Sequence, residues 1–110
     1  MHKLSLDALA REQLERARHG SAGRSAATVF GGHEQTLMQT LLALTAGTTL
    51  AEHENPGEAT VHVLTGRVRL SAGKDSWDGR AGDLLVIPPG RHDLHAVEDA
   101  AVLLTVAIRR

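Results

Sequence analysis

Residues 82–92 read Gly82-Asp83-Leu84-Leu85-Val86-Ile87-Pro88-Pro89-Gly90-Arg91-His92, and they say more about the fold than any other stretch. A glycine turn leads into a short apolar run, and a Pro-Pro-Gly corner ends that run. Proline cannot stay in the hydrogen-bonded ladder of a central strand, whereas glycine tolerates a reversal of the chain. The segment therefore predicts a buried β-strand, a sharp turn and a second strand that begins near His92.

The chain from Ala26 onward repeats this pattern of short strands separated by turn signals. The candidate strands are residues 27–30, 36–45, 49–53, 59–64, 67–72, 83–87, 92–97 and 100–108. Glycine, proline and asparagine mark most of the breaks between them, including a long break from Gly73 to Gly79. Strands this short, at this spacing, indicate an all-β sandwich or barrel.

The N-terminal segment has a helical period instead. Ser5 can cap a helix over residues 5–18, and Gly20 ends it. One side of this helix carries the apolar residues Leu6, Leu9, Leu14 and Ala17. We therefore expect a helical and linker arm over residues 1–25 and a barrel domain over residues 26–110.

Two strands are apolar on both faces, over residues 37–44 and 101–108. In an antiparallel sheet one face normally meets water, which gives an alternating pattern. The loss of alternation predicts that the second face of these strands is also covered. We expect the helix to cover one part of that face and a second copy of the chain to cover the rest. The sequence thus predicts a homodimer. By contrast, residues 67–70 alternate, with Val68 and Leu70 expected inside the barrel and the two arginines outside.

Composition excludes several classes of protein. A length of 110 residues fits one domain, and the absence of cysteine excludes disulfides and thiolate sites. The formal charge of −1 provides no basic stripe for nucleic acid. No apolar run is long enough for a signal peptide or a membrane span, so we expect a soluble cytoplasmic protein.

The single tryptophan, Trp77, is expected to cover an apolar edge rather than to stack on a ligand.

A second segment completes the pattern of the first. It reads Gly47-x5-His53-x-Asn55 and runs on to Gly66. Together the two segments resemble the two sequence motifs of the cupin superfamily, over about residues 44–108, in its small single-domain, conserved-barrel form. The resemblance implies an antiparallel jelly-roll β-barrel, in which three histidines and one glutamate of the full pattern surround one divalent metal.

The chain departs from that full ligand set. His53 and His92 match two of the four ligands, whereas Asn55 stands in place of a histidine and Ala59 in place of the glutamate. One residue fewer than usual separates Gly90 from His92. The resemblance therefore implies a ligand pocket at His53, Asn55 and His92. It also implies a degenerate metal site, in which His53 and His92 bind zinc, iron, manganese or nickel weakly.

A different strand register would rebuild the ligand set. Val61 and Val63 are natural interior residues, so Ala59 should share their inward face. A bulge after Gly57 would instead turn Glu58 and His62 inward, beside His53 and His92. That register expels both valines from the core, at about 1.5–3 kcal/mol for each side chain.

Two classes of function follow. The first is a module that binds or senses a small polar molecule, because the ligand set is incomplete and no nucleophile or cofactor motif is present. The second is a small metal-dependent enzyme, an isomerase, epimerase or dioxygenase-like protein, because the superfamily includes many of these.

Overall fold

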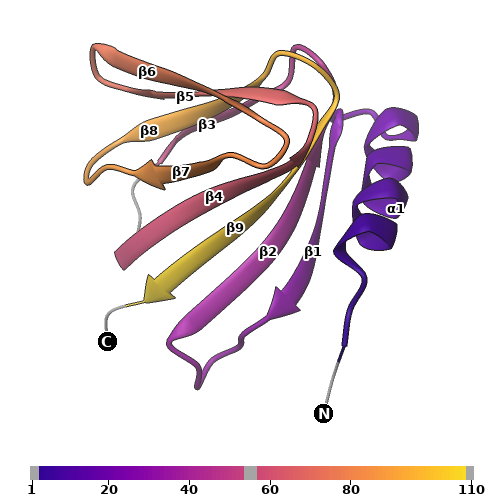
Figure 1. Cartoon of the computed structure of the whole chain (residues 1–110), viewed down its shortest axis with the longest axis horizontal. Coiled ribbons are helices and arrows are strands. Elements are labelled where there is room, and N and C mark those ends of the chain that lie inside the picture. Colours follow the sequence, from indigo (N-terminus) through magenta and orange to yellow (C-terminus); the bar gives the residue numbers. More distant parts are fainter. Residues whose placement is uncertain (1–2, 54–56, 109–110) are drawn as a thin grey trace.

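The computed structural model describes residues 3–53 and 57–108, which form one helix and nine strands (Figure 1). The helix α1 spans Leu6–His19. The strands are β1 Arg24–Phe30, β2 Leu37–Leu44, β3 Thr49–His53, β4 Gly57–Thr65, β5 Arg67–Ala72, β6 Asp75–Arg80, β7 Leu84–Ile87, β8 His92–Ala96 and β9 Ala100–Ile108.

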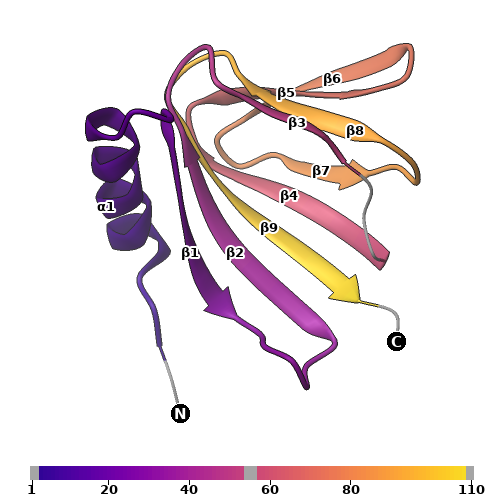
Figure 2. The same cartoon turned by 180° about the vertical axis from the view of Figure 1, so that it is seen from behind.

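The strands form two facing antiparallel sheets. One sheet has five strands in the order β1-β2-β9-β4-β7, and the other has four in the order β3-β8-β5-β6. Figure 2 shows the same two layers from behind, with α1 beside β1 at one end of the larger sheet. The prediction of an all-β antiparallel jelly roll with an N-terminal helix is confirmed.

The helix has the caps that its sequence predicts, and each of its ends lies one residue later in the chain than in the predicted range of 5–18. The hydroxyl oxygen of Ser5 accepts a hydrogen bond from the Ala8 N–H at 3.2 Å, which satisfies one of the unpaired donors of the first turn. Gly20 closes the other end, where its N–H donates to the carbonyl oxygen of Arg16 at 2.9 Å. Within the described residues no helix is long and apolar enough to cross a membrane.

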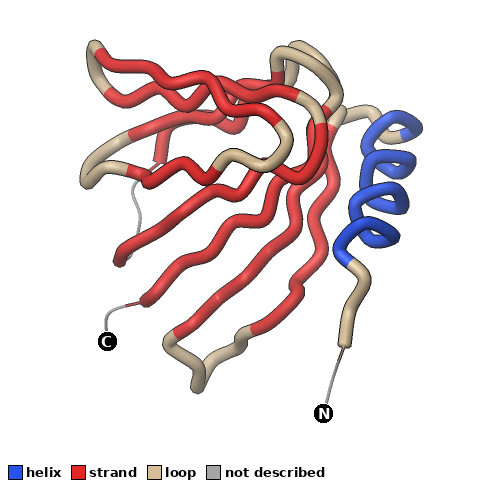
Figure 3. The backbone as a smooth tube through the Cα atoms, in the orientation of Figure 1, coloured by secondary structure: helices blue, strands red, loops and turns tan. Residues whose placement is uncertain are grey.

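The helix packs on the outer face of the larger sheet, so that face is covered over part of its width (Figure 3). Leu14 and Ala17 of the helix lie against Leu41 and Ala43 of β2, and neither strand residue is exposed to solvent. This contact confirms that the helix covers one side of a strand that is apolar on both faces. Strand β1 begins at Arg24, inside the expected linker, because residues 24–26 continue the ladder with β2.

The space between the two sheets holds the main core. Val68 and Leu70 point into it, as their alternation predicts, with 0% and 1% of their surfaces exposed. Val61 and Val63 face them from the larger sheet. The other buried members are Leu44, Ala59, Ile87, Leu94, Ala96, Ala100, Val102 and Val106.

Strand β6 lies where the sequence predicts a break, so that prediction is wrong. The segment pairs with β5 along its whole length, from Arg67↔Arg80 to Ala72↔Asp75. Aspartate, serine and glycine have low strand propensity, and β6 has only one apolar side chain to signal its period. Charged residues are nevertheless common on edge strands, where they discourage pairing with another chain.

The outer face of this hairpin carries an ion-pair cluster. Arg67 donates to one oxygen of the Asp78 carboxylate at 2.6 Å, and Arg69 donates to the other at 2.9 Å. These two hydrogen bonds lower the pKa of Asp78 to about 2. Both arginines thus lie outside the barrel, as predicted, and Asp78 fixes them across the strand pair.

The turn between β4 and β5 passes very close to the chain at residues 99–100. A Cβ atom on Gly66 would lie 2.1 Å from the carbonyl oxygen of Asp99, and the backbone has φ +81°. The Asp99 carboxylate accepts from the Ala46 N–H at 2.8 Å and from Arg18 of the helix at 2.9 Å, and both bonds lower its pKa. This corner therefore joins the helix and three turns.

We expect Gly66→Ala to destabilise the fold strongly. The left-handed backbone alone costs an alanine roughly 1–2 kcal/mol, and the overlap with Asp99 should raise the total loss to about 4 kcal/mol. Gly82→Ala is the matched control, because Gly82 has φ +94° but no atom within 4 Å of the added Cβ. Urea unfolding of both variants measures the difference. Equal losses would show that the close approach at Gly66 has no energetic role.

Candidate functional site

His92 is a buried polar residue on the inner face of the smaller sheet. It begins strand β8, in which burial alternates, and 2% of its surface is exposed. Leu94 and Ala96 follow it on the same inner face. His95 lies on the opposite face, where its Nδ1 is 2.6 Å from the hydroxyl oxygen of Thr49. One end of this otherwise aliphatic inner face is therefore occupied by an imidazole.

The turn before β8 fixes how the His92 ring can act. Its Nδ1 lies 3.3 Å from the carbonyl oxygen of Gly90, which can only accept a hydrogen bond. In a neutral ring that bond requires the proton on Nδ1, so Nε2 carries the lone pair. Gly90 has φ +96°. This backbone conformation lets the turn bring His92 inward, although the turn is one residue shorter than usual.

His53 is brought next to His92 by strand pairing. It ends strand β3, and its backbone is the direct antiparallel partner of His92. The pairing register shifts between Leu50 and His53. The side chain of His53 and the whole of Asn55 lie outside the described part of the structure, so the predicted pocket of His53, Asn55 and His92 stays a prediction at those two positions.

The register of β4 decides where the remaining candidates point. Strand β4 pairs with β7 and β9 without a shift from Gly57 to Val63, so the alternative bulged register does not form. Ala59 is 5% exposed and belongs to the core, whereas Glu58 is exposed and His62 is half-buried on the outer side. The hypothesis that Glu58 and His62 complete an interior ligand set is therefore wrong for this backbone.

The described donors do not fit the full metal site that the resemblance implies. Among the side chains that the structure describes, no three His, Cys, Asp or Glu residues gather in one place. At the position of the usual glutamate, the methyl group of Ala59 packs in the core cluster that includes Ile87 and Val106. Catalytic zinc sites usually take three protein ligands, and the described inner face supplies His92 as one.

A cavity that the sequence did not predict lies at the rim of the barrel. It has a volume of about 480 Å³ and lies between the β5–β6 hairpin and the turn after β7. Its lining includes Trp77, Arg91, Asp75, Pro88, Pro89 and Ala72. Trp77 is 44% exposed and lines this cavity, so part of its ring is open to a ligand, while the expectation that it covers an apolar edge stays a prediction. Trp77 pairs with the inward residue Leu70, so the position of β6 in the sheet places Trp77 on the inward face. The sequence of β6 has no alternating apolar pattern that would predict this strand.

Comparison with known proteins identifies the family. The family model of the cupin domain matches residues 40–108. Together with the jelly roll and the inward His92, this match shows that the chain belongs to the cupin family. No curated protein matches the sequence.

Several solved structures have a similar fold. A conserved protein of unknown function from Streptococcus pyogenes is 27% identical, with a TM-score of 0.73, and the match covers 83% of this chain and 79% of that one. KdgF from Halomonas sp. is 22% identical, with a TM-score of 0.67 and coverage of 80% and 82%. A salicylate 1,2-dioxygenase variant from Pseudoaminobacter salicylatoxidans is 22% identical, with a TM-score of 0.70 and coverage of 92% and 32%.

Proposed function

We propose that this small cupin binds or senses a small polar molecule inside the barrel, at the end where strands β3 and β8 bring His53 and His92 together. The observation that carries the proposal is the burial of His92, with 2% of its surface exposed, on an otherwise apolar inner face. A leucine would be the ordinary residue at such a core position, whereas an imidazole needs hydrogen-bond partners, which here include Gly90 and a further interaction within the protein. A binding role explains why an imidazole stands there.

The chemistry of His92 favours a hydroxylated ligand. With its proton directed at Gly90, the neutral ring has its lone pair on Nε2. His92 also makes a further interaction within the protein, and a ligand hydroxyl would compete for this lone pair, which could also act as a general base. The aliphatic neighbours on the inner face would contact the carbon skeleton of the same molecule.

We expect His92→Leu to remain folded, with a free energy of unfolding within about 1 kcal/mol of wild type, because the polar interactions of the buried ring, including its hydrogen bond to Gly90, are exchanged for apolar contacts. The variant should lose the thermal shifts that wild type shows with a panel of monosaccharides and hydroxy acids. His95→Leu is the matched control, since it changes the same residue type on the outer face of the same strand. Wild-type responses in His92→Leu would contradict the proposal.

A metal-dependent cupin enzyme, an isomerase, epimerase or dioxygenase, is the second candidate function. It is favoured by the bond between Nδ1 of His92 and the Gly90 carbonyl, because metal-bound histidines usually donate their other N–H to such a group. Metal analysis of protein purified without added metal tests it. About one equivalent of zinc, iron, manganese or nickel, lost in His92→Leu and kept in His95→Leu, would favour the enzyme. Metal-free wild-type protein would favour the binding module.

We further propose that the chain is a homodimer that buries the part of the larger sheet left open by the helix. Strand pairing aligns Leu41, Leu103, His62 and Leu84 in one row across that outer face. The helix covers the β2 end of this row, whereas Leu84 is 60% exposed. Val86 is 73% exposed two residues further along the same edge strand. A second copy of the same face would bury these side chains.

The double substitution Leu84→Lys with Val86→Lys should convert the dimer into a folded monomer, because charged groups would enter the apolar contact. Analytical ultracentrifugation at micromolar concentration measures the change. Leu4→Lys serves as the control, since Leu4 is 54% exposed but precedes the helix and lies outside the sheet. Monomeric wild-type protein at that concentration would remove the argument for this interface.

A further inference from the structure

The cavity at the barrel rim opens where the two edge strands separate. Strands β6 and β7 meet at Gly79, where an added Cβ would lie 3.0 Å from Leu85 and 3.1 Å from Val63. Beyond that contact β7 stops at Ile87 and two prolines carry the chain away, while β6 extends back to Asp75 (Figure 1). The result is a cavity of about 480 Å³ that is walled by one sheet edge and one turn.

Trp77 provides an aromatic surface in this cavity. Its cross-strand partner is Leu70, which is 1% exposed, so Trp77 belongs to the inward face of the smaller sheet. Because β7 ends early, the indole is left 44% exposed rather than covered. An indole face in such a position packs well against an aromatic ring or against the C–H face of a sugar ring. Pro88, Pro89 and Ala72 add further apolar surface to the same cavity.

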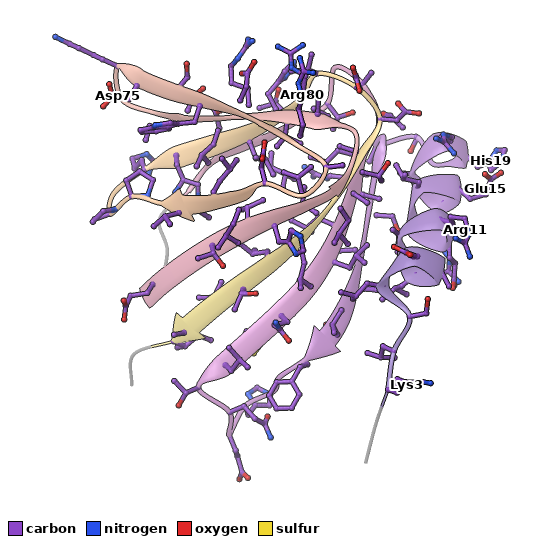
Figure 4. All side chains as sticks on the ribbon, viewed as in Figure 1. Lys3, Arg11, Glu15, His19, Asp75 and Arg80 are labelled. Atoms are coloured by element: carbon purple, nitrogen blue, oxygen red, sulfur yellow. The ribbon has the colours of Figure 1, made fainter. Side chains whose placement is uncertain are left out.

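Two side chains of opposite charge complete the lining. Arg91 comes from the turn between β7 and β8, and Asp75 comes from the tip of the β5–β6 hairpin, where Figure 4 shows it. Arg91 also makes an interaction within the protein, but a guanidinium has several N–H donors and can hold a further acceptor. A planar guanidinium matches a carboxylate in two parallel hydrogen bonds, and an aspartate accepts hydrogen bonds from hydroxyl groups.

We propose that this rim cavity is a binding site for a ring compound that carries a carboxylate and a hydroxyl group. The ring packs on Trp77, the carboxylate pairs with Arg91, and the hydroxyl donates to Asp75. Both sugar acids and hydroxylated aromatic acids have this chemistry. His92 is not among the residues that line this cavity, although Arg91 precedes it in the chain, and the proposal does not depend on the function proposed for the barrel interior.

The single tryptophan makes the site directly observable. Because the chain has one Trp, its ¹H–¹⁵N spectrum has a single indole N–H signal, which reports on this cavity alone. D-glucuronate and 4-hydroxybenzoate are the two probes, and the one that shifts the indole signal identifies the kind of ring. D-glucose, which lacks the carboxylate, and acetate, which lacks the ring, should leave the signal in place at the same concentrations.

Arg91→Gln should weaken the binding of the active probe by about ten-fold or more, because a charge-assisted hydrogen bond is lost. Arg80→Gln is the matched control, with the same change of charge at the far end of β6, as Figure 4 shows. His92→Leu should leave the titration unchanged. The proposal is overturned if neither probe moves the indole signal, if acetate moves it equally, or if Arg91→Gln binds like Arg80→Gln. Loss of probe binding in folded His92→Leu would place the probe in the barrel interior and also overturn it.

Discussion

Burial of strand β9 on both faces is the constraint on which the rest of this structure depends. Ala100 and Val102 lie in the core between the sheets, while Ala101 lies in the second cluster beneath the helix. A strand that is apolar on both sides cannot lie at the surface of an ordinary antiparallel sheet. The barrel must therefore close on one side and the helix must dock on the other, which explains why a domain this small has an N-terminal helix.

The sequence predicts those parts of the fold in which burial leaves a regular pattern. The capped helix and the inward positions of Val68 and Leu70 follow from their spacing. Strand β6 could not be predicted, because its one apolar residue, Trp77, gives no alternation. This segment is a strand because it pairs with the neighbouring strand β5. Pairing of that kind depends on tertiary context and cannot be predicted from the residues of β6 alone. The rim cavity is not predictable from the sequence for the same reason, since one of its walls is β6.

The candidate site was predictable to a similar degree. The inward position of His92 follows from its place at the start of a strand that alternates. The register of β4 follows from Val61 and Val63, which keep Ala59 inside and Glu58 outside. The hydrophobic pattern of β4 therefore fixes Ala59 at the inward position where the resemblance expects the glutamate. What the sequence could not supply was the bond between His92 and Gly90, because that contact depends on the path of the shortened turn.

The order of strands in the larger sheet has a consequence for how the chain folds. Strand β2 pairs with β9, and residues 45–99 lie between them. Contacts between such distant segments require closure of a long loop before any stabilisation is gained, so folding of this sheet is slow compared with that of a helical domain of equal size. During synthesis, the helix and the β1–β2 hairpin emerge first with their apolar faces open. They depend on the last strand for cover, which makes the nascent chain vulnerable to aggregation until residue 108 is available.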